Sequence, residues 1–205
     1  MVQTQPQIVL PQTKPPRHYV SFSAEIVPQT TEALIATLSN LANQQVPEVH
    51  LLLSTAGGSV MHGITLYNTL RAMPFELVTH NVGNVNSIGN AVFLAGTRRY
   101  ACPQSTFMFH GVGFNVPPGG ARFEEKLLRE RLDGLLADQK RIADIMENCT
   151  TLPREEIDKL FLEAVTKDAD WAVGAGIVDE VRDVDIADGH PVLGLVFQRE
   201  GVVGT

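Results

Sequence analysis

Residues 49–58 read VHLLLSTAGG, and residues 75–91 read FELVTHNVGNVNSIGNA. Each stretch begins with a run rich in apolar and β-branched residues and ends at glycines, which predicts a buried strand followed by a tight turn. Apolar residues at helical spacing follow the first turn, from Ile64 to Leu70. Strands that alternate with crossover helices pair in parallel, so the sequence predicts an α/β fold.

The same alternation continues on both sides of this stretch. The sequence predicts strands over residues 19–23, 49–54, 75–81, 99–101, 106–109 and 177–181. It predicts helices over residues 30–42, 87–95, 153–162 and 170–175. Residues 111–120 hold four glycines and two prolines, which indicates an irregular, exposed segment.

Residues 121–148 predict one long amphipathic helix, because apolar residues recur at three- and four-residue steps along it. A helix of this length spans about 42 Å, which is long for a domain of this size. We therefore expect part of its apolar stripe to face another subunit. The alternative is a helix that lies wholly on its own core.

Composition narrows the classes of function. A chain of 205 residues forms one domain, and its net charge of −7 argues against nucleic acid as a partner. Cys102 and Cys149 lie far apart, so neither a disulfide framework nor a metal site is expected, and a cytoplasmic location fits. No signal peptide or membrane span is predicted.

Residues 1–17 are rich in Gln and Pro and predict a flexible arm, followed by a domain over 18–188 and a tail over 189–205.

Three features suggest acyl-transfer chemistry. Ser87 follows a strand and a glycine-rich turn, and His110 ends the apolar run Phe107–Phe109. Gly58 follows a buried strand, where a backbone N–H can approach a ligand closely. A hydroxyl nucleophile, a base and N–H donors for an oxyanion are the parts that acyl transfer needs, with the N–H of Ile88 as a further donor. The alternatives are a serine that caps a helix, a histidine of the core and a plain glycine turn.

Other site chemistries find less support. No pair of histidines has the spacing of a helical zinc motif, and we expect no metal or other cofactor. No lysine lies between Lys14 and Lys126, which argues against a Ser–Lys dyad.

The order of these motifs resembles the proteolytic subunit of the Clp protease family. That family carries SPGG, GxAASMG, a strand that ends in Met-Ile-His, and YGLID, and here the matching stretches are STAGGSV, GNVNSIGNA, FMFH and AGIVDEV. The similarity runs from about residue 19 to residue 184. It implies a crotonase-type fold of repeated β-β-α units, with Ser87 as the nucleophile and His110 as the general base of a serine endopeptidase. It also implies an oxyanion hole formed by the N–H groups of Gly58 and Ile88.

The resemblance implies partners as well. The helix over 121–148 corresponds to the family's handle, which interlocks two heptameric rings into a hollow tetradecamer. The expected partners are further copies of this chain and an AAA+ unfoldase ATPase, and the expected substrates are peptides and unfolded proteins.

The sequence departs from the family at the third position of the triad. The expected aspartate corresponds to Ala164, which leaves Glu163 or Asp168 as candidates to orient His110. Asn86 and Asn90 replace the alanines usual around the nucleophile. A non-catalytic ring subunit of the same fold is therefore an alternative. An acyl-CoA enzyme of the crotonase superfamily is another, although Ser87 and His110 together argue against it.

Overall fold

A computed structural model describes residues 17–114, 119–120 and 122–197. The predicted N-terminal arm lies outside the described residues, apart from Arg17. Residues 198–205 of the predicted tail, residues 115–118 of the predicted glycine-rich segment and Ala121 lie outside them as well.

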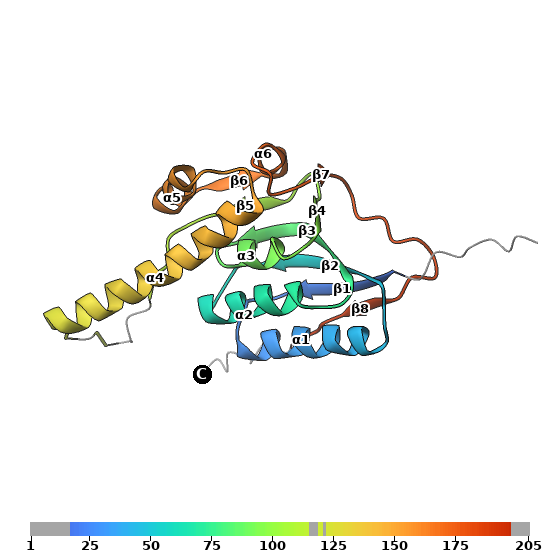
Figure 1. The fold of residues 1–205 in the computed structure, drawn as a ribbon, viewed down its shortest axis with the longest axis horizontal. Helices are drawn as coiled ribbons and strands as arrows, with labels where there is room; N and C mark the ends of the chain where they lie inside the picture. Colours follow the sequence, from blue (N-terminus) through green and yellow to red (C-terminus); the bar gives the residue numbers. More distant parts are fainter. Residues whose placement is uncertain (1–16, 115–118, 121, 198–205) are drawn as a thin grey trace, which may run out of the picture.

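A parallel sheet forms the centre of the molecule (Figure 1). Its strands run in the order β6-β5-β3-β2-β1-β8, and β4 pairs with β3 and β7. Every pair is parallel except β5 with β6. The strand bounds are β1 His18–Ser23, β2 Glu48–Thr55, β3 Glu76–Asn86, β4 Arg98–Ala101, β5 Thr106–Met108, β6 Thr166–Asp168, β7 Glu180–Val181 and β8 Val192–Gly194. The predicted α/β class is confirmed.

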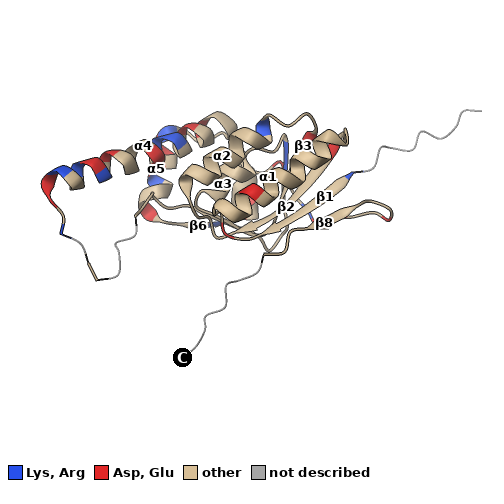
Figure 2. Ribbon diagram, turned by 90° about the horizontal axis from the view of Figure 1, so that it is seen from below, with Lys and Arg blue, Asp and Glu red and all other residues tan. Residues whose placement is uncertain are grey.

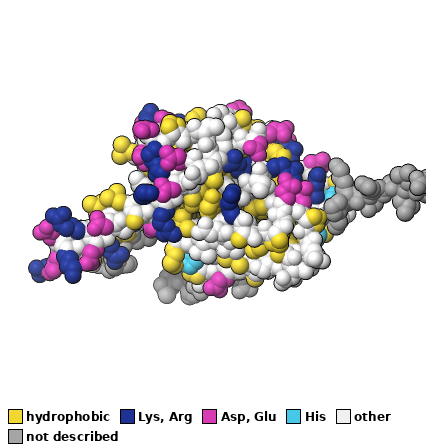
Figure 3. Space-filling model, in the orientation of Figure 1, with side chains coloured by type: hydrophobic (Ala, Val, Ile, Leu, Met, Phe, Trp, Pro, Cys, Tyr) yellow, Lys and Arg dark blue, Asp and Glu magenta, His cyan; other side chains and the backbone are white. Residues whose placement is uncertain are grey.

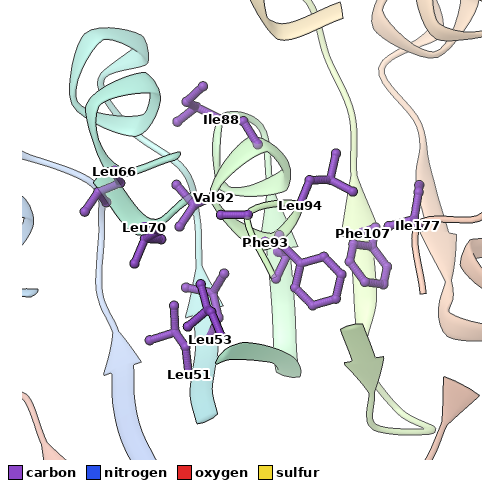
Figure 4. Close-up of a cluster of buried hydrophobic side chains, with 14 of the residues drawn as sticks. Leu51, Leu53, Leu66, Leu70, Ile88, Val92, Phe93, Leu94, Phe107 and Ile177 are labelled. Atoms are coloured by element: carbon purple, nitrogen blue, oxygen red, sulfur yellow. The ribbon is translucent and has the colours of Figure 1, made fainter. Parts of the chain in front are cut away.

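Three helices cover one face of this sheet: α1 (Pro28–Asn43), α2 (Val60–Arg71) and α3 (Gly89–Phe93) (Figure 1). Alternate residues of β2 point toward them, so Leu51 and Leu53 are fully buried. Figure 4 shows these leucines packed near side chains of α2 and α3, with Phe107 of β5 and Ile177 on the other side of α3. Burial of this apolar face provides the main driving force for the fold.

Strand β3 changes its partner along its length. Residues 78–81 pair with β4, whereas residues 84–86 pair with β5. Asn81 lies at the change, where its side-chain N–H donates to the carbonyl oxygen of Thr106 over 2.8 Å. The last residues of β3 therefore run beside the strand that leads to His110.

Helix α4 (Glu125–Cys149) is the predicted handle, although it begins later than the expected Ala121. Its C-terminal part packs on the body through Ile142, Ala143 and Met146, whereas its N-terminal part projects into solvent (Figure 1). Acidic and basic residues are interspersed along the projecting part (Figure 2), and Glu125 and Arg129 form one of its ion pairs spaced four residues apart.

An apolar stripe also lies on this projecting part. We call it the handle stripe, and it consists of Leu127, Leu128, Leu132 and Leu136, whose exposed fractions range from 36% to 54%. In Figure 3, hydrophobic side chains lie along α4 between its charged free end and the body. The alternative of a helix buried wholly on its own core is therefore wrong.

The C-terminal third adds elements that the sequence did not predict. Helices α5 (Arg154–Glu163) and α6 (Ala169–Gly174) lie near the expected positions, but the short strands β6 and β8 were not predicted. The last predicted strand is also shorter, since β7 covers only Glu180–Val181. Within the described residues, no helix combines the length and the apolar character that crossing a membrane requires.

A row of rings crosses the sheet face opposite the three helices. We call it the histidine row, and it consists of Tyr19, His50, His80 and Tyr100, one from each of β1 to β4. Successive ring centroids lie 4.6, 5.0 and 5.3 Å apart. The Arg182 guanidinium lies 3.5 Å from the centroid of the Tyr100 ring and ends the row.

Candidate active site

Ser87 occupies a tight turn between β3 and α3. Its φ of 55° lies in the left-handed region, which is unusual for a residue other than glycine. The Ser87 N–H donates to the carbonyl oxygen of Met108 over 2.8 Å, so the turn is attached to the end of β5. The structure begins the helix at Gly89 rather than at the predicted Ser87. A strained serine between a strand and a helix is a recurrent feature of nucleophilic serines.

His110 lies two residues beyond β5, in a backbone segment that is fixed on both sides. The Phe109 N–H donates to the carbonyl oxygen of Val165 over 2.9 Å, and the Gly111 N–H donates to that of Phe161 over 3.0 Å. His110 itself is exposed. Its Nδ1 lies 2.7 Å from the carbonyl oxygen of Gly111.

The structure brings Ser87, His110 and Gly58 to one cavity of about 90 Å³. Its other lining residues are apolar or glycine: Val60, Phe109, Val112, Gly113, Ile142 and Phe161. A larger groove of about 530 Å³ shares Gly58, Val60, Val112 and Gly113 with it and continues along α4. The predicted nucleophile, base and glycine therefore share one cavity, with a larger groove of mixed polarity beside it.

The two glycines after β2 allow the backbone to approach Ser87. Gly57 and Gly58 have φ of 92° and 144°, which side-chain-bearing residues rarely adopt. A Cβ atom at Gly57 would lie only 2.8 Å from the Ser87 Cβ. Within the described part of the chain, the N–H groups of Gly58 and Ile88 donate no hydrogen bond, which leaves both available for an oxyanion.

The candidates for the third triad position, Glu163 and Asp168, form no hydrogen bond or ion pair with His110 among the described residues. Ala164 ends α5 in the left-handed conformation, in the segment between Phe161 and Val165 that runs beside His110. Among the described residues, no carboxylate forms a hydrogen bond or an ion pair with the imidazole of His110.

Asp168 and Glu163 lie elsewhere in the fold. The Asp168 carboxylate accepts the Trp171 N–H over 2.8 Å and caps α6. Asp168 also pairs with Thr106, which precedes His110 by four residues, or about 13 Å of extended chain. Glu163 is the last residue of α5 and is exposed.

Asn90 is a site residue whose role the sequence did not reveal. It is 2% exposed, and its Nδ2 group donates to the carbonyl oxygens of Ser87 and Met108, each over 2.9 Å. It therefore joins the turn of the nucleophile to the strand that leads to the base. The signal in the sequence is an asparagine inside an otherwise apolar helix, Gly89–Phe93.

A second polar cluster involves the histidine row. The Glu48 carboxylate accepts from His50 Nε2 over 2.6 Å, and His50 Nδ1 lies 2.8 Å from His80 Nε2. When both rings are neutral, His80 Nε2 must therefore donate to His50 Nδ1, which leaves the buried Nδ1 of His80 without a partner among the described residues. Burial, aided by His50 and by the Arg182 and Arg98 charges, lowers the pKa of His80 to about 3. The described residues contain no group of three or more side chains suited to a metal ion.

An α/β protein that presents a serine, a histidine and a glycine with an available N–H in one cavity has the arrangement of an acyl-transfer hydrolase. Comparison with known proteins is more specific. The family model for Clp protease matches residues 16–185, so the chain belongs to the Clp protease family. The resemblance noted in the sequence is thereby confirmed.

The chain is similar to proteolytic subunits from chlamydiae. It is 26% identical over 165 residues to the ATP-dependent Clp protease proteolytic subunit 2 of Chlamydia muridarum, with 79% of each chain covered. It is 27% identical over the same length to the corresponding subunit 1 of Chlamydia felis, with 79% of each chain covered. The alignments thus span most of both chains.

Proposed function

We propose that this chain is an active serine endopeptidase subunit in which Ser87 is the nucleophile and His110 the general base. The single observation that carries the proposal is the cavity that Ser87, His110 and Gly58 line together. Family membership implies a serine-type hydrolase, and the strained Ser87 turn supports the assignment of the nucleophile.

The proposed reaction is acyl transfer in two steps. His110 Nε2 takes the Ser87 hydroxyl proton while Oγ bonds to the peptide carbonyl carbon, and the N–H groups of Gly58 and Ile88 stabilise the oxyanion. The C–N bond then breaks, and His110 returns the proton to the leaving amine. Water hydrolyses the acyl-enzyme with His110 again as base, which restores the Ser87 hydroxyl.

The groove beside the cavity suits an extended peptide. It runs between Val60 of α2, the segment around Val112 and Gly113, and Leu135 of α4. Its lining combines apolar residues and glycines with the charged residues Glu130, Arg131 and Asp138 of α4, so we expect both apolar and polar side chains of unfolded proteins and peptides to bind there. By family membership, we propose stacked heptameric rings, an AAA+ ATPase partner and a cytoplasmic location.

A non-catalytic ring subunit is the second candidate function. It is favoured by Ala164 and by a His110 that contacts no carboxylate within the described residues. The test is hydrolysis of an unfolded protein and of fluorogenic peptides by the wild type, Ser87→Ala and His110→Gln. The endopeptidase predicts turnover that both substitutions reduce by at least a thousandfold. No turnover by folded, assembled wild-type protein would instead identify a non-catalytic subunit.

A further inference from the structure

The partner of His110 determines which of its ring nitrogens carries the proton. Nδ1 lies 2.7 Å from the carbonyl oxygen of Gly111. A carbonyl oxygen only accepts hydrogen bonds, so the Nδ1 of His110 must be the donor. In the neutral ring, Nε2 then holds the lone pair. This is the tautomer that a general base needs in order to accept the serine proton through Nε2.

We propose that the main-chain carbonyl of Gly111 orients His110 in place of the carboxylate of a Ser-His-Asp triad. Gly111 is thus a positioning residue that acts through His110. The inference rests on the proposed function, because an orienting group matters only if His110 is the base. It accounts for Ala164 without requiring a rearrangement that brings Glu163 or Asp168 to His110.

The backbone around Gly111 is held in place, as an orienting group must be. The Gly111 N–H donates to the Phe161 carbonyl oxygen over 3.0 Å, and the neighbouring Phe109 N–H donates to that of Val165 over 2.9 Å. Gly111 is half-buried, and a Cβ atom there would lie 3.0 Å from the Gln139 Oε1. The carbonyl therefore has a defined position relative to the ring.

A carbonyl and a carboxylate differ in one respect. Both fix the tautomer, but only the carboxylate adds a charge-assisted hydrogen bond to the imidazolium that forms during the reaction. The Gly111 arrangement therefore predicts a base of correct geometry that functions without help from any acidic side chain.

The first measurement reads the tautomer directly. We would record ¹⁵N magic-angle-spinning NMR spectra of the assembled, histidine-labelled protein at about pH 8, where an ordinary imidazole is neutral. The His110→Gln variant assigns the His110 signals by difference. The expected result is a protonated Nδ1 and an unprotonated Nε2. A predominantly Nε2-protonated His110 would overturn the proposal.

The second measurement separates the carbonyl from the two carboxylates. Glu163→Gln and Asp168→Asn remove the charges at nearly constant shape, and asparagine still caps α6. We expect both variants to keep the His110 tautomer and to keep kcat within about threefold of the wild type. A change of tautomer, or a loss of kcat of tenfold or more, in either variant would assign the orienting role to that carboxylate and contradict the proposal.

Labelling of the same samples with a serine-directed fluorophosphonate keeps the two hypotheses apart. An unlabelled Ser87 beside an Nδ1-protonated His110 would reject the proposed endopeptidase function while supporting the Gly111 hydrogen bond. A labelled Ser87 beside an Nε2-protonated His110 would reject the Gly111 assignment alone.

Discussion

Asn90 connects the nucleophile to the base through two main-chain carbonyls, those of Ser87 and Met108. We expect Asn90→Ala to lower the free energy of unfolding by about 1–3 kcal/mol, because two part-buried hydrogen bonds are lost. We also expect kcat to fall by about tenfold, or about 1.4 kcal/mol of barrier, since the Ser87 turn keeps its main-chain bond to Met108 but loses the second link that Asn90 provides. Denaturant unfolding and peptide hydrolysis measure the two effects.

Asn86→Ala is the matched control for this prediction. The Asn86 side chain forms no hydrogen bond with other described residues, although the residue adjoins Ser87. Its replacement should therefore change stability and kcat much less than Asn90→Ala does. Equal effects of the two substitutions would refute the role given to Asn90.

For single residues of the candidate site, the sequence predicted where along the chain they lie better than it predicted their backbone conformations and hydrogen bonds. Ser87, His110 and Gly58 were predicted because each follows a strand, and the ends of parallel strands meet at one edge of a sheet. The left-handed φ of Ser87 and the hydrogen bond from Asn90 to Met108 were not predictable, because the Ser87 turn and the Asn90 side chain are both bonded to the distant strand β5. The Gly111 carbonyl carries no side-chain signal in the sequence at all.

Among the elements, the histidine row makes the sheet sensitive to acid. Tyr19 and Tyr100 flank His50 and His80 in the row, with Arg182 beyond Tyr100. The charged groups nearby are Glu48, which bonds to His50, and Arg17 and Arg98, which both pair with Glu48. Burial lowers the pKa of His50, which the hydrogen bond to Glu48 opposes, and lowers that of His80 to about 3. Burial also opposes the shift at Glu48, but His50, Arg17 and Arg98 outweigh it and lower the pKa of this carboxyl.

These shifts predict that stability falls as pH falls. The unfolded chain binds protons at its histidines near pH 6.5, whereas folded His80 stays neutral, so acid favours unfolding. The free energy of unfolding should be greatest above about pH 6.5 and should fall by up to roughly 1.4 kcal/mol per pH unit for one such group below it. Urea unfolding between about pH 7 and pH 5 tests this window. The ordinary pKa values of Asp and Glu lie below it, so carboxyl groups contribute little to the change.

His80→Gln should flatten that dependence, because a glutamine amide still donates to His50 Nδ1 but does not titrate. His62→Gln removes a histidine outside the row and serves as control. If the free energy of unfolding of His80→Gln depended on pH as steeply as that of the wild type, His80 would not be the source of the acid sensitivity.

Among the elements, the length and burial pattern of each segment decided how well it could be predicted. The amphipathic pattern of α4 and the apolar runs of β2 and β3 are long enough to identify. Strands β6 and β8 have three residues each, and β8 is exposed throughout, so neither carries a periodic signal. They exist because β5 and β1 provide partners for them.

For the whole molecule, the handle stripe predicts assembly. Four leucines remain exposed on the projecting part of α4, an apolar surface that a second ring would cover. We expect the wild type to form large multimers and the variant Leu128→Asp, Leu132→Asp, Leu136→Asp to form single rings or smaller species. Light scattering at tens of micromolar measures the mass.

Exposed positions on the polar side of the same helix provide the control. Asp133→Asn and Glu130→Gln change charges on the projecting part without touching the stripe, so they should leave the mass unchanged. A monomeric wild type under these conditions would contradict assembly through α4.

The central claim is that Ser87 is a nucleophile activated by His110. The most direct measurement is reaction with a fluorophosphonate, followed by mass-spectrometric location of the adduct in wild type, Ser87→Ala and His110→Gln. We expect one adduct per chain, on Ser87, which is lost in Ser87→Ala and formed far more slowly in His110→Gln. An adduct that persists in Ser87→Ala, or an assembled wild-type protein that forms none, would contradict it.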